Sequence, residues 1–394
     1  MKSKIIESIK KNISLIIIVL GFLLTYIYKL SNFPYKASLL NKTGDFIGSV
    51  HFTDIWHNGY FFPYKILELL VSFTHLPFSP VTLKIPALAI SLFSVILVYE
   101  VIKKWHGNYV AFLGTLLFLS WPVSLHLGRS NYSLIVYLLL IPSLYLIRII
   151  SGSSIKNNRL YVSLFLQSLI ILIPGGIWFV LLSLYFNRNN LITLFKNNLN
   201  FIKIFFTLIS GLFWVPFVVN NILNARNQFL YFIGINNFSF KLLVSYNTYL
   251  TPIKELFISG IKNQSIWLPG SPIFNVFLIT FFILGVTFYI KNINATRSRL
   301  IISSLVLAYI LTLFNPDMIF VLSTVIFFIS ISGIHTFLLL WTKKFPVNKI
   351  AEVFAYSLLT LLVVVSIFYN YRSYFIAWKY SQNTISLFDL RPKN

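Results

Sequence analysis

Residues 318–341 read MIFVLSTVIFFISISGIHTFLLLW, an apolar segment that contains no Lys, Arg, Asp or Glu. A helix of about 20 such residues is long enough to cross the hydrocarbon core of a bilayer. Apolar segments of similar character recur at 13–28, 83–102, 109–127, 131–150, 160–174, 175–187, 203–221, 272–290, 299–314 and 350–369. The sequence therefore predicts an all-α polytopic membrane protein with about eleven transmembrane helices, forming a single membrane-embedded domain over residues 1–394.

The composition supports this class and excludes several others. Apolar residues make up 57% of the chain, and 32 Lys and Arg face nine Asp and Glu. The absence of cysteine excludes disulfides, thiol nucleophiles and thiolate metal sites. The basic residues lie in short connections between apolar segments rather than in a basic domain. We therefore expect the lipid bilayer, with its anionic head groups, as their partner, and no nucleic acid.

The positions of these basic residues predict the orientation of the chain. Cytoplasmic loops of membrane proteins carry an excess of Lys and Arg. With the N-terminus inside, short basic connections such as Lys103-Lys104 and Lys343-Lys344 all fall on the inner side. We expect a multi-pass protein of the cytoplasmic (inner) membrane, with the N-terminus inside and the C-terminus outside. No small-residue cleavage site follows the first apolar segment, so we expect it to be retained as a helix.

This orientation leaves two long loops and a tail on the outer side. The first outer loop covers about 29–82 and contains the amphipathic stretch Tyr64–Leu76, which suits a helix lying on the membrane surface. The second outer loop covers about 222–271, and the tail covers about 370–394. Loops of this length usually carry function, so the candidate site is expected on the outer side.

One break is predicted within an apolar stretch. Pro174-Gly175-Gly176 divides residues 160–187 into two short pieces. Proline and glycine interrupt helices, which favours two short helices here. A single kinked span is the alternative.

Two aspartates in the first outer loop are the candidates for catalysis. Asp45 follows Gly44 in a predicted turn beside the bilayer, where burial by a substrate would raise its pKa toward that of a general base. The alternative is a turn-forming aspartate that hydrogen-bonds its own backbone. Asp54 and His57 are spaced i, i+3 and share a face if this stretch is helical. They would then orient one another beside the substrate, and the alternative is a solvated helix start.

No metal and no cofactor are expected. Asp45, Asp54 and His57 make too small a ligand set for an oxygen-preferring metal. His75, His106 and His335 have no partner at a ligand spacing in the sequence.

Four cations are candidates for binding a phosphate on the outer side. Arg129 lies in Leu127-Gly128-Arg129-Ser130-Asn131, where almost no loop joins two apolar segments. A guanidinium fixed there can grip a phosphate in a bidentate manner. The alternative is an arginine that reaches up to lipid head groups. Lys65, Lys84 and Arg226 are weaker candidates for the same role.

Several motifs together resemble one family, the polytopic lipid-linked-sugar glycosyltransferases with the C-type membrane fold, especially their protein-mannosyltransferase-like and aminoarabinose-transferase-like branch. The resemblance covers most of the chain and is diffuse. The stretches that carry it are Gly44-Asp45, Phe62-Pro63-Tyr64-Lys65-Ile66, Leu83-Lys84-Ile85-Pro86-Ala87-Leu88, Leu127-Gly128-Arg129-Ser130-Asn131, the segment from Tyr246 to Gly285, and Tyr374-Phe375-Ile376-Ala377-Trp378. Lys84 stands where the family usually has an arginine, and Phe46 stands where it usually has a second acid.

The resemblance implies transfer of a sugar from a polyprenyl-phosphate carrier to a lipid, glycan or protein acceptor on the outer face. The reaction would invert the sugar configuration and use an aspartate base, with no metal. Asp45 or Asp54 would be the base, Arg129 would hold the phosphate, and Lys65 or Arg226 would assist it.

Two other classes stay open. A transporter or flippase of a lipid-linked substrate would need polar residues at mid-depth in its spans, and the apolar segments contain few. A non-catalytic membrane homologue that binds a lipid or a partner subunit is the other, because the paired acid beside Asp45 is missing.

Overall fold

The computed structural model describes residues 2–30, 62–74, 79, 81–152, 163, 166–197, 226–235, 246–261, 267–268, 270–346, 348–382 and 384–385. Within these ranges the chain forms helices and irregular connections and no strand, which confirms the all-α prediction for this part.

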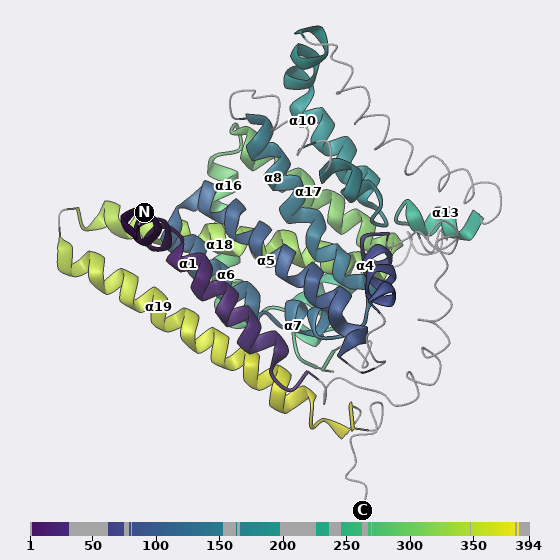
Figure 1. Cartoon of the computed structure of the whole chain (residues 1–394). Helices are drawn as coiled ribbons and strands as arrows, with labels where there is room; N and C mark the ends of the chain where they lie inside the picture. Colours follow the sequence, from purple (N-terminus) through teal and green to yellow (C-terminus); the bar gives the residue numbers. More distant parts are fainter. Residues whose placement is uncertain are drawn as a thin grey trace, which may run out of the picture.

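The helices follow one another with short connections through most of the described chain (Figure 1). The α-helices are α1 (Lys2–Ile27), α4 (Phe62–Phe73), α5 (Ile85–His106), α6 (Asn108–Ser120), α7 (Pro122–Gly128), α8 (Tyr137–Gly152), α10 (Gly176–Asn197), α13 (Arg226–Phe232), α15 (Tyr246–Lys254), α16 (Val276–Lys291), α17 (Thr296–Phe314), α18 (Ile319–Lys344) and α19 (Lys349–Arg372). The short helices are the 3-10 turns η2 (Thr82–Lys84), η3 (Ser133–Val136) and η5 (Pro316–Met318) and the π-helical turns η4 (Glu255–Ser259) and η6 (Ser373–Trp378).

Five described helical stretches are long and apolar enough to cross a membrane, and a sixth results if the bent pair α6–α7 is one span. The five are Thr82–His106, Ser133–Ile150, Thr296–Phe314, Pro316–Lys344 and Lys349–Trp378. Two shorter apolar helices, Ile13–Ile27 and Val276–Lys291, accompany them. The chain is therefore a multi-pass helical membrane protein. The full set of eleven spans stays a prediction, because 203–221 and part of 160–174 (160–162 and 164–165) lie outside the described residues.

The bundle has a buried centre and an apolar surface. In the most apolar part of the α18 stretch, 94% of the residues are buried, compared with 22% in the α19 stretch. The outward face of α19 consists of large apolar side chains, such as Ile350, Val353, Leu361 and Phe368. A patch of this size would be a liability in water. Hydrocarbon is the solvent that suits it, which agrees with a membrane-embedded bundle.

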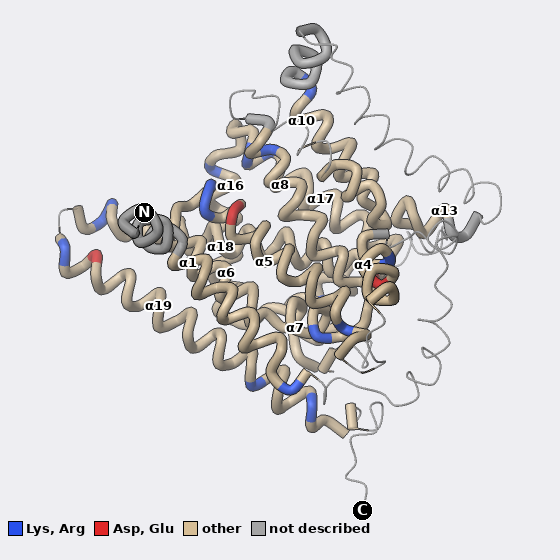
Figure 2. Tube along the Cα trace, in the orientation of Figure 1, with Lys and Arg blue, Asp and Glu red and all other residues tan. Residues whose placement is uncertain are grey.

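The helix ends gather at two opposite ends of the bundle. At the Arg297 end, Arg297 of α17 contacts Trp105 and His106, which end α5. At the Arg129 end, Arg129 contacts the C-terminal residues of α1. Figure 2 shows that most described Lys and Arg lie near these ends and not along the middle of the helices. Basic residues also lie in the last turns of α5, α16 and α18 and in the first turns of α17 and α19, namely Lys103, Lys104, Lys291, Lys343, Lys344, Arg299 and Lys349. Whether the Arg297 end faces the cytoplasm stays a prediction.

The predicted break at Pro174-Gly175-Gly176 is confirmed. A helix ends in the turn at 172–175, and α10 begins at Gly176. Gly175 has φ +72°, a conformation that side chains with a Cβ rarely adopt, and its N–H donates to the carbonyl of Phe232 at 2.7 Å. Because of the break, the last residue of α13, Phe232, can hydrogen-bond the backbone just before α10.

The structure adds detail to three predicted segments. The segment 109–127 is not one straight helix, because Pro122 divides it into α6 and α7 at an angle of 56°. Helix α10 continues past 187 to Asn197, through a polar stretch that hydropathy alone does not recognise as helical. The tail expected from 370 is helical as far as Trp378, because Tyr374 and Trp378 are buried against α7.

Two glycines allow α16 and α18 to pack in backbone contact. A Cβ at Gly333 would overlap the carbonyl oxygen of Phe281, and a Cβ at Gly285 would overlap that of Ile329. Small residues at helix interfaces are the usual means of close packing in membranes, where no hydrophobic force drives helices together. These glycines thus fix how closely the central helix α18 and its neighbour approach.

Substitution of Gly333 or Gly285 by alanine is therefore expected to destabilise the protein by about 1–3 kcal/mol each through overpacking. The matched control is Gly21→Ala, where the new methyl would meet Leu119 at an ordinary 3.7 Å. The measurement is thermal unfolding of the purified protein in detergent. Equal midpoints for all three variants would contradict the proposed backbone contact.

Candidate functional site

Arg129 is the most completely buried cation at its end of the bundle, with no exposed surface. Its Nη1 donates to the carbonyl oxygens of Thr25 at 2.6 Å and Tyr26 at 3.2 Å, and its Nη2 donates to that of Tyr28 at 2.7 Å. The guanidinium therefore binds the last carbonyls of α1, which have no partner within their own helix. A positive charge is also favoured there by the helix dipole.

The local sequence explains how α7 brings Arg129 to this place. Gly128 lies so close to Tyr26 and Ser91 that a Cβ would overlap both side chains. The hydroxyl of Tyr26 also hydrogen-bonds Ser124 of α7 at 2.6 Å. Gly128 thus lies directly against α1, and the side chain of the next residue, Arg129, reaches the end of this helix.

Lys84 binds a backbone carbonyl three residues beyond the end of α1. Its Nζ donates to the carbonyl oxygen of Leu30 at 2.7 Å, and the side chain is buried. In the part of the chain that the structure describes, the sole ion pair joins Lys65 and Glu68, so neither Lys84 nor Arg129 has a described carboxylate partner. Two buried cations are therefore stabilised here by carbonyl oxygens rather than by a described carboxylate.

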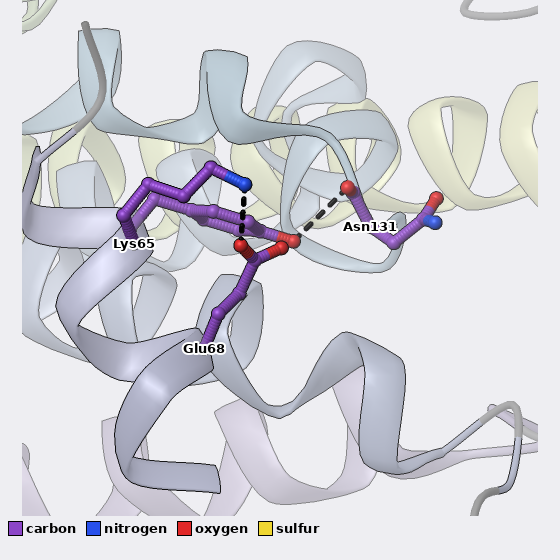
Figure 3. A network of polar contacts seen from close by, with 4 residues as sticks. Lys65, Glu68 and Asn131 are labelled. Carbon is purple, nitrogen blue, oxygen red and sulfur yellow. Dashed lines mark hydrogen bonds and ion pairs between the residues drawn. The ribbon is translucent and has the colours of Figure 1, made fainter. Parts of the chain in front are cut away.

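Lys65 lies on α4, which is anchored to the Arg129 turn. The Tyr64 hydroxyl donates to the carbonyl oxygen of Asn131 at 3.0 Å, and Lys65 forms an ion pair with Glu68 at 2.7 Å (Figure 3). Burial raises the pKa of the Glu68 carboxyl, and the Lys65 ammonium partly offsets this effect. The Lys65–Glu68 pair therefore lies on α4 beside Tyr64, the residue that contacts the Arg129 turn.

A buried aromatic cluster surrounds His126, which lies one turn before Arg129. Its ring lies 4.7 Å from that of Trp267, 4.8 Å from Tyr374 and 4.1 Å from Trp378. The guanidinium of Arg129 lies over the rings of Tyr374 and Phe375, at 5.6 and 4.8 Å. The C-terminal stretch 374–378 thus covers the face of Arg129 that α1 leaves open.

A second polar group lies where α13 meets the start of α18. The Tyr231 hydroxyl donates to Asp317 Oδ2 at 2.9 Å, and Trp178 donates to the carbonyl oxygen of Ile233 at 2.7 Å. These bonds fix the stretch 231–233 against α10 and the start of α18. Asp317 has no described ion-pair partner.

The structure thus brings together two of the predicted site residues, Arg129 and Lys84, and places beside them α4, the helix that carries Lys65. Asp45, Asp54 and His57 lie outside the described residues, and Arg226 is described as the first residue of α13 without its side chain. Arg129 is enclosed by carbonyls and aromatic rings, so the predicted grip on a phosphate would require α1 or η6 to move. That role stays a prediction.

Sequence reasoning missed several residues of this end. His126, Trp267 and Trp378 were not expected to meet, and 141 and 252 positions separate the two tryptophans from the histidine. Similarly, His106 and His335 lack a partner in the sequence, but their rings lie 4.6 Å apart. Spacing along the chain carries no signal for contacts between distant helices. The resemblance at Tyr374–Trp378 was the one sequence feature that pointed to this stretch.

No protein-family model matches the chain, and no curated protein sequence is significantly similar to it.

Replacement of Arg129 by glutamine is expected to destabilise the protein by about 3 kcal/mol or more, because buried carbonyls lose charge-assisted donors. The matched control is Arg372→Gln, which removes an exposed charge at the end of α19. Thermal unfolding and hydrogen exchange of residues 25–30 would measure the effect. Equal exchange in both variants would argue against the proposed anchoring of α1.

The raised pKa of Glu68 predicts a pH dependence of stability. A carboxyl with a raised pKa binds its proton more tightly in the folded state, so stability falls as pH rises through that pKa. The wild type should therefore lose stability relative to Glu68→Gln as pH rises above 4.5, the ordinary pKa of this carboxyl. Parallel unfolding midpoints for the two proteins across this range would show that Glu68 does not titrate differently on folding.

Proposed function

We propose that this protein transfers a sugar from a polyprenyl-phosphate carrier to an acceptor on the outer face of the membrane, as a glycosyltransferase of the hexosyl- or pentosyltransferase type. The observation that carries the proposal is the pair of buried cations, Arg129 and Lys84, bound to the end of α1. Residue 31, where the segment with both candidate aspartates begins, follows directly on this anchored end.

The other border of that segment supports the same reading. Helix α4 begins at Phe62, immediately after the segment, and Tyr64 binds the Asn131 carbonyl beside Arg129. The carboxylate-bearing segment 31–61 is therefore tied at both borders to one end of the bundle. In the proposal, these two attachments keep the general base near a fixed set of cations. Glycosyl transfer requires this proximity, because base and cations act on the same substrate.

The proposed chemistry is a single inverting displacement. The acceptor hydroxyl oxygen attacks the anomeric carbon, the bond from this carbon to the phosphate oxygen breaks, and polyprenyl phosphate leaves with the electron pair. Asp45 or Asp54 takes the proton of the acceptor hydroxyl. Cations steady the charge of the leaving phosphate. Lys65 is the described candidate for this contact, since it is partly exposed, with His57 and Arg226 as further candidates.

Arg129 and Lys84 have a positioning role in this proposal. Their donors are engaged by the carbonyls of α1 and of Leu30, so they hold the start of the catalytic segment rather than the substrate. The bilayer itself delivers the polyprenyl donor to the bundle, which accounts for a membrane core around a sugar-transfer site. The acceptor would be a lipid, a glycan or a protein. We place the enzyme in the cytoplasmic membrane, with the Arg129 end outside.

The test is transfer from a radiolabelled polyprenyl-phosphate sugar in native membranes, with several donor sugars. The variants are Asp45→Asn and Asp54→Asn at matched expression. One of them should lose transfer by about 100-fold or more, since a general base contributes roughly 10²–10⁴-fold. The control is Glu352→Gln, which removes an exposed carboxylate at the Arg297 end.

Full transfer by both aspartate variants would remove the assigned mechanism. A wild type that transfers none of the donor sugars would contradict the proposed activity as a whole. In that case, a transporter or flippase of a lipid-linked substrate becomes the better hypothesis.

A further inference from the structure

A second polar cluster lies at the opposite end of the bundle, and the proposed transfer reaction does not use it. Five side chains from four helices meet there, none of them acidic. They are Arg297 of α17, His106 of α5, Tyr289 of α16, and Ser332 and His335 of α18.

Arg297 joins these helices through neutral acceptors. Its Nη2 lies 2.6 Å from His106 Nε2 and 3.2 Å from the Tyr289 hydroxyl, and its Nη1 donates to the Trp105 carbonyl oxygen at 3.3 Å. The guanidinium also lies over the Trp105 ring, 4.3 Å from its centroid. The short contact requires His106 Nε2 to be unprotonated, since an Nε2–H would face an Arg N–H.

The cluster has more donors than acceptors. His106 Nδ1 and Arg297 Nε are both buried and lack a hydrogen-bond partner. With Nε2 unprotonated, Nδ1 carries the proton of the neutral imidazole, so both groups are unpaired donors. Unpaired buried donors are rare and need an explanation. Within the described ranges, no carboxylate forms an ion pair with Arg297 that would neutralise its charge.

His335 gives the cluster an accessible side. Its ring lies 4.6 Å from that of His106, it is half-buried, and it makes no hydrogen bond within the described residues. Two imidazoles side by side can also bind a metal, but the guanidinium at 2.6 Å from His106 repels a cation. No group of three potential metal-ligating residues occurs among the residues searched. An anion is therefore the ligand that suits this set of groups.

The position of the cluster indicates which anion. It lies at the end of the bundle where α5 and α16 stop and α17 begins, the level at which lipid head groups surround a membrane protein. Lys104 in the last turn of α5 and Lys343 in the last turn of α18 are both exposed. Guanidinium groups bind phosphate through paired, charge-assisted hydrogen bonds. We propose that Arg297, His106 and His335 form a binding site for a phosphate monoester, as carried by the head group of an anionic phospholipid.

The test uses the full chain in phosphatidylcholine nanodiscs that contain increasing fractions of phosphatidic acid. Native mass spectrometry counts the bound lipid, and thermal unfolding measures its stabilising effect. The variants are Arg297→Gln and His335→Gln. The matched control is Arg299→Gln, which removes an exposed charge from the same helix, two residues away. A parallel series adds inorganic phosphate to discs of phosphatidylcholine alone.

Wild type and Arg299→Gln should bind phosphatidic acid equally, and His335→Gln and Arg297→Gln should bind it about tenfold or more weakly. Should Arg297→Gln fail to fold, His335→Gln decides, since His335 makes no described hydrogen bond. Stabilisation by inorganic phosphate would identify a free phosphate as the ligand, and stabilisation by phosphatidic acid alone would identify the lipid. Unchanged affinity in His335→Gln, or equal losses in His335→Gln and Arg299→Gln, would overturn the proposal.

Discussion

The charge-assisted hydrogen bonds from Arg129 to the end of α1 are the interaction on which the rest of this end depends. In hydrocarbon, the last carbonyls of a helix have no water to bind, and an unsatisfied carbonyl costs several kcal/mol. A buried guanidinium is equally unfavourable without acceptors. Each group therefore satisfies the other, since Arg129 has no described carboxylate partner. The pairing fixes α1 against α7, and α1 in turn fixes where the segment that follows residue 30 begins.

The same solution recurs in different forms through the bundle. Lys84 uses the carbonyl of Leu30, Arg297 uses that of Trp105, and Arg148 donates to Asn187 and to the Phe186 carbonyl. Because the chain has 32 basic and nine acidic residues, ion pairs cannot neutralise most of its cations. Backbone dipoles and aromatic faces replace them, which explains how a strongly basic chain maintains a largely apolar bundle.

Much of the fold could be predicted from the sequence, because uninterrupted apolar segments have few alternatives in a membrane. The helices α5, α16, α17 and α18 lie where the sequence predicted spans. The contacts of the candidate site were harder to predict from the sequence. Arg129 was predicted to lie fixed in a short turn with a phosphate as its ligand, and the structure places the carbonyls of Thr25, Tyr26 and Tyr28 around its guanidinium. Its binding of a phosphate stays a prediction. The carbonyl contacts depend on which helix packs beside the turn, and one-dimensional patterns contain no such information.

The helical extension 373–378 has a consequence for how the protein is made. Its side chains Tyr374 and Trp378 close over His126, and α1 holds Arg129 from the other side. During synthesis, α1 enters the membrane first, α7 follows, and this extension emerges more than two hundred residues later. Until then, Arg129 and His126 are uncovered on the side where this extension packs. The ribosome must therefore release most of the chain before this end of the bundle is sealed, and membrane chaperones would have a long interval in which to recognise the open intermediate.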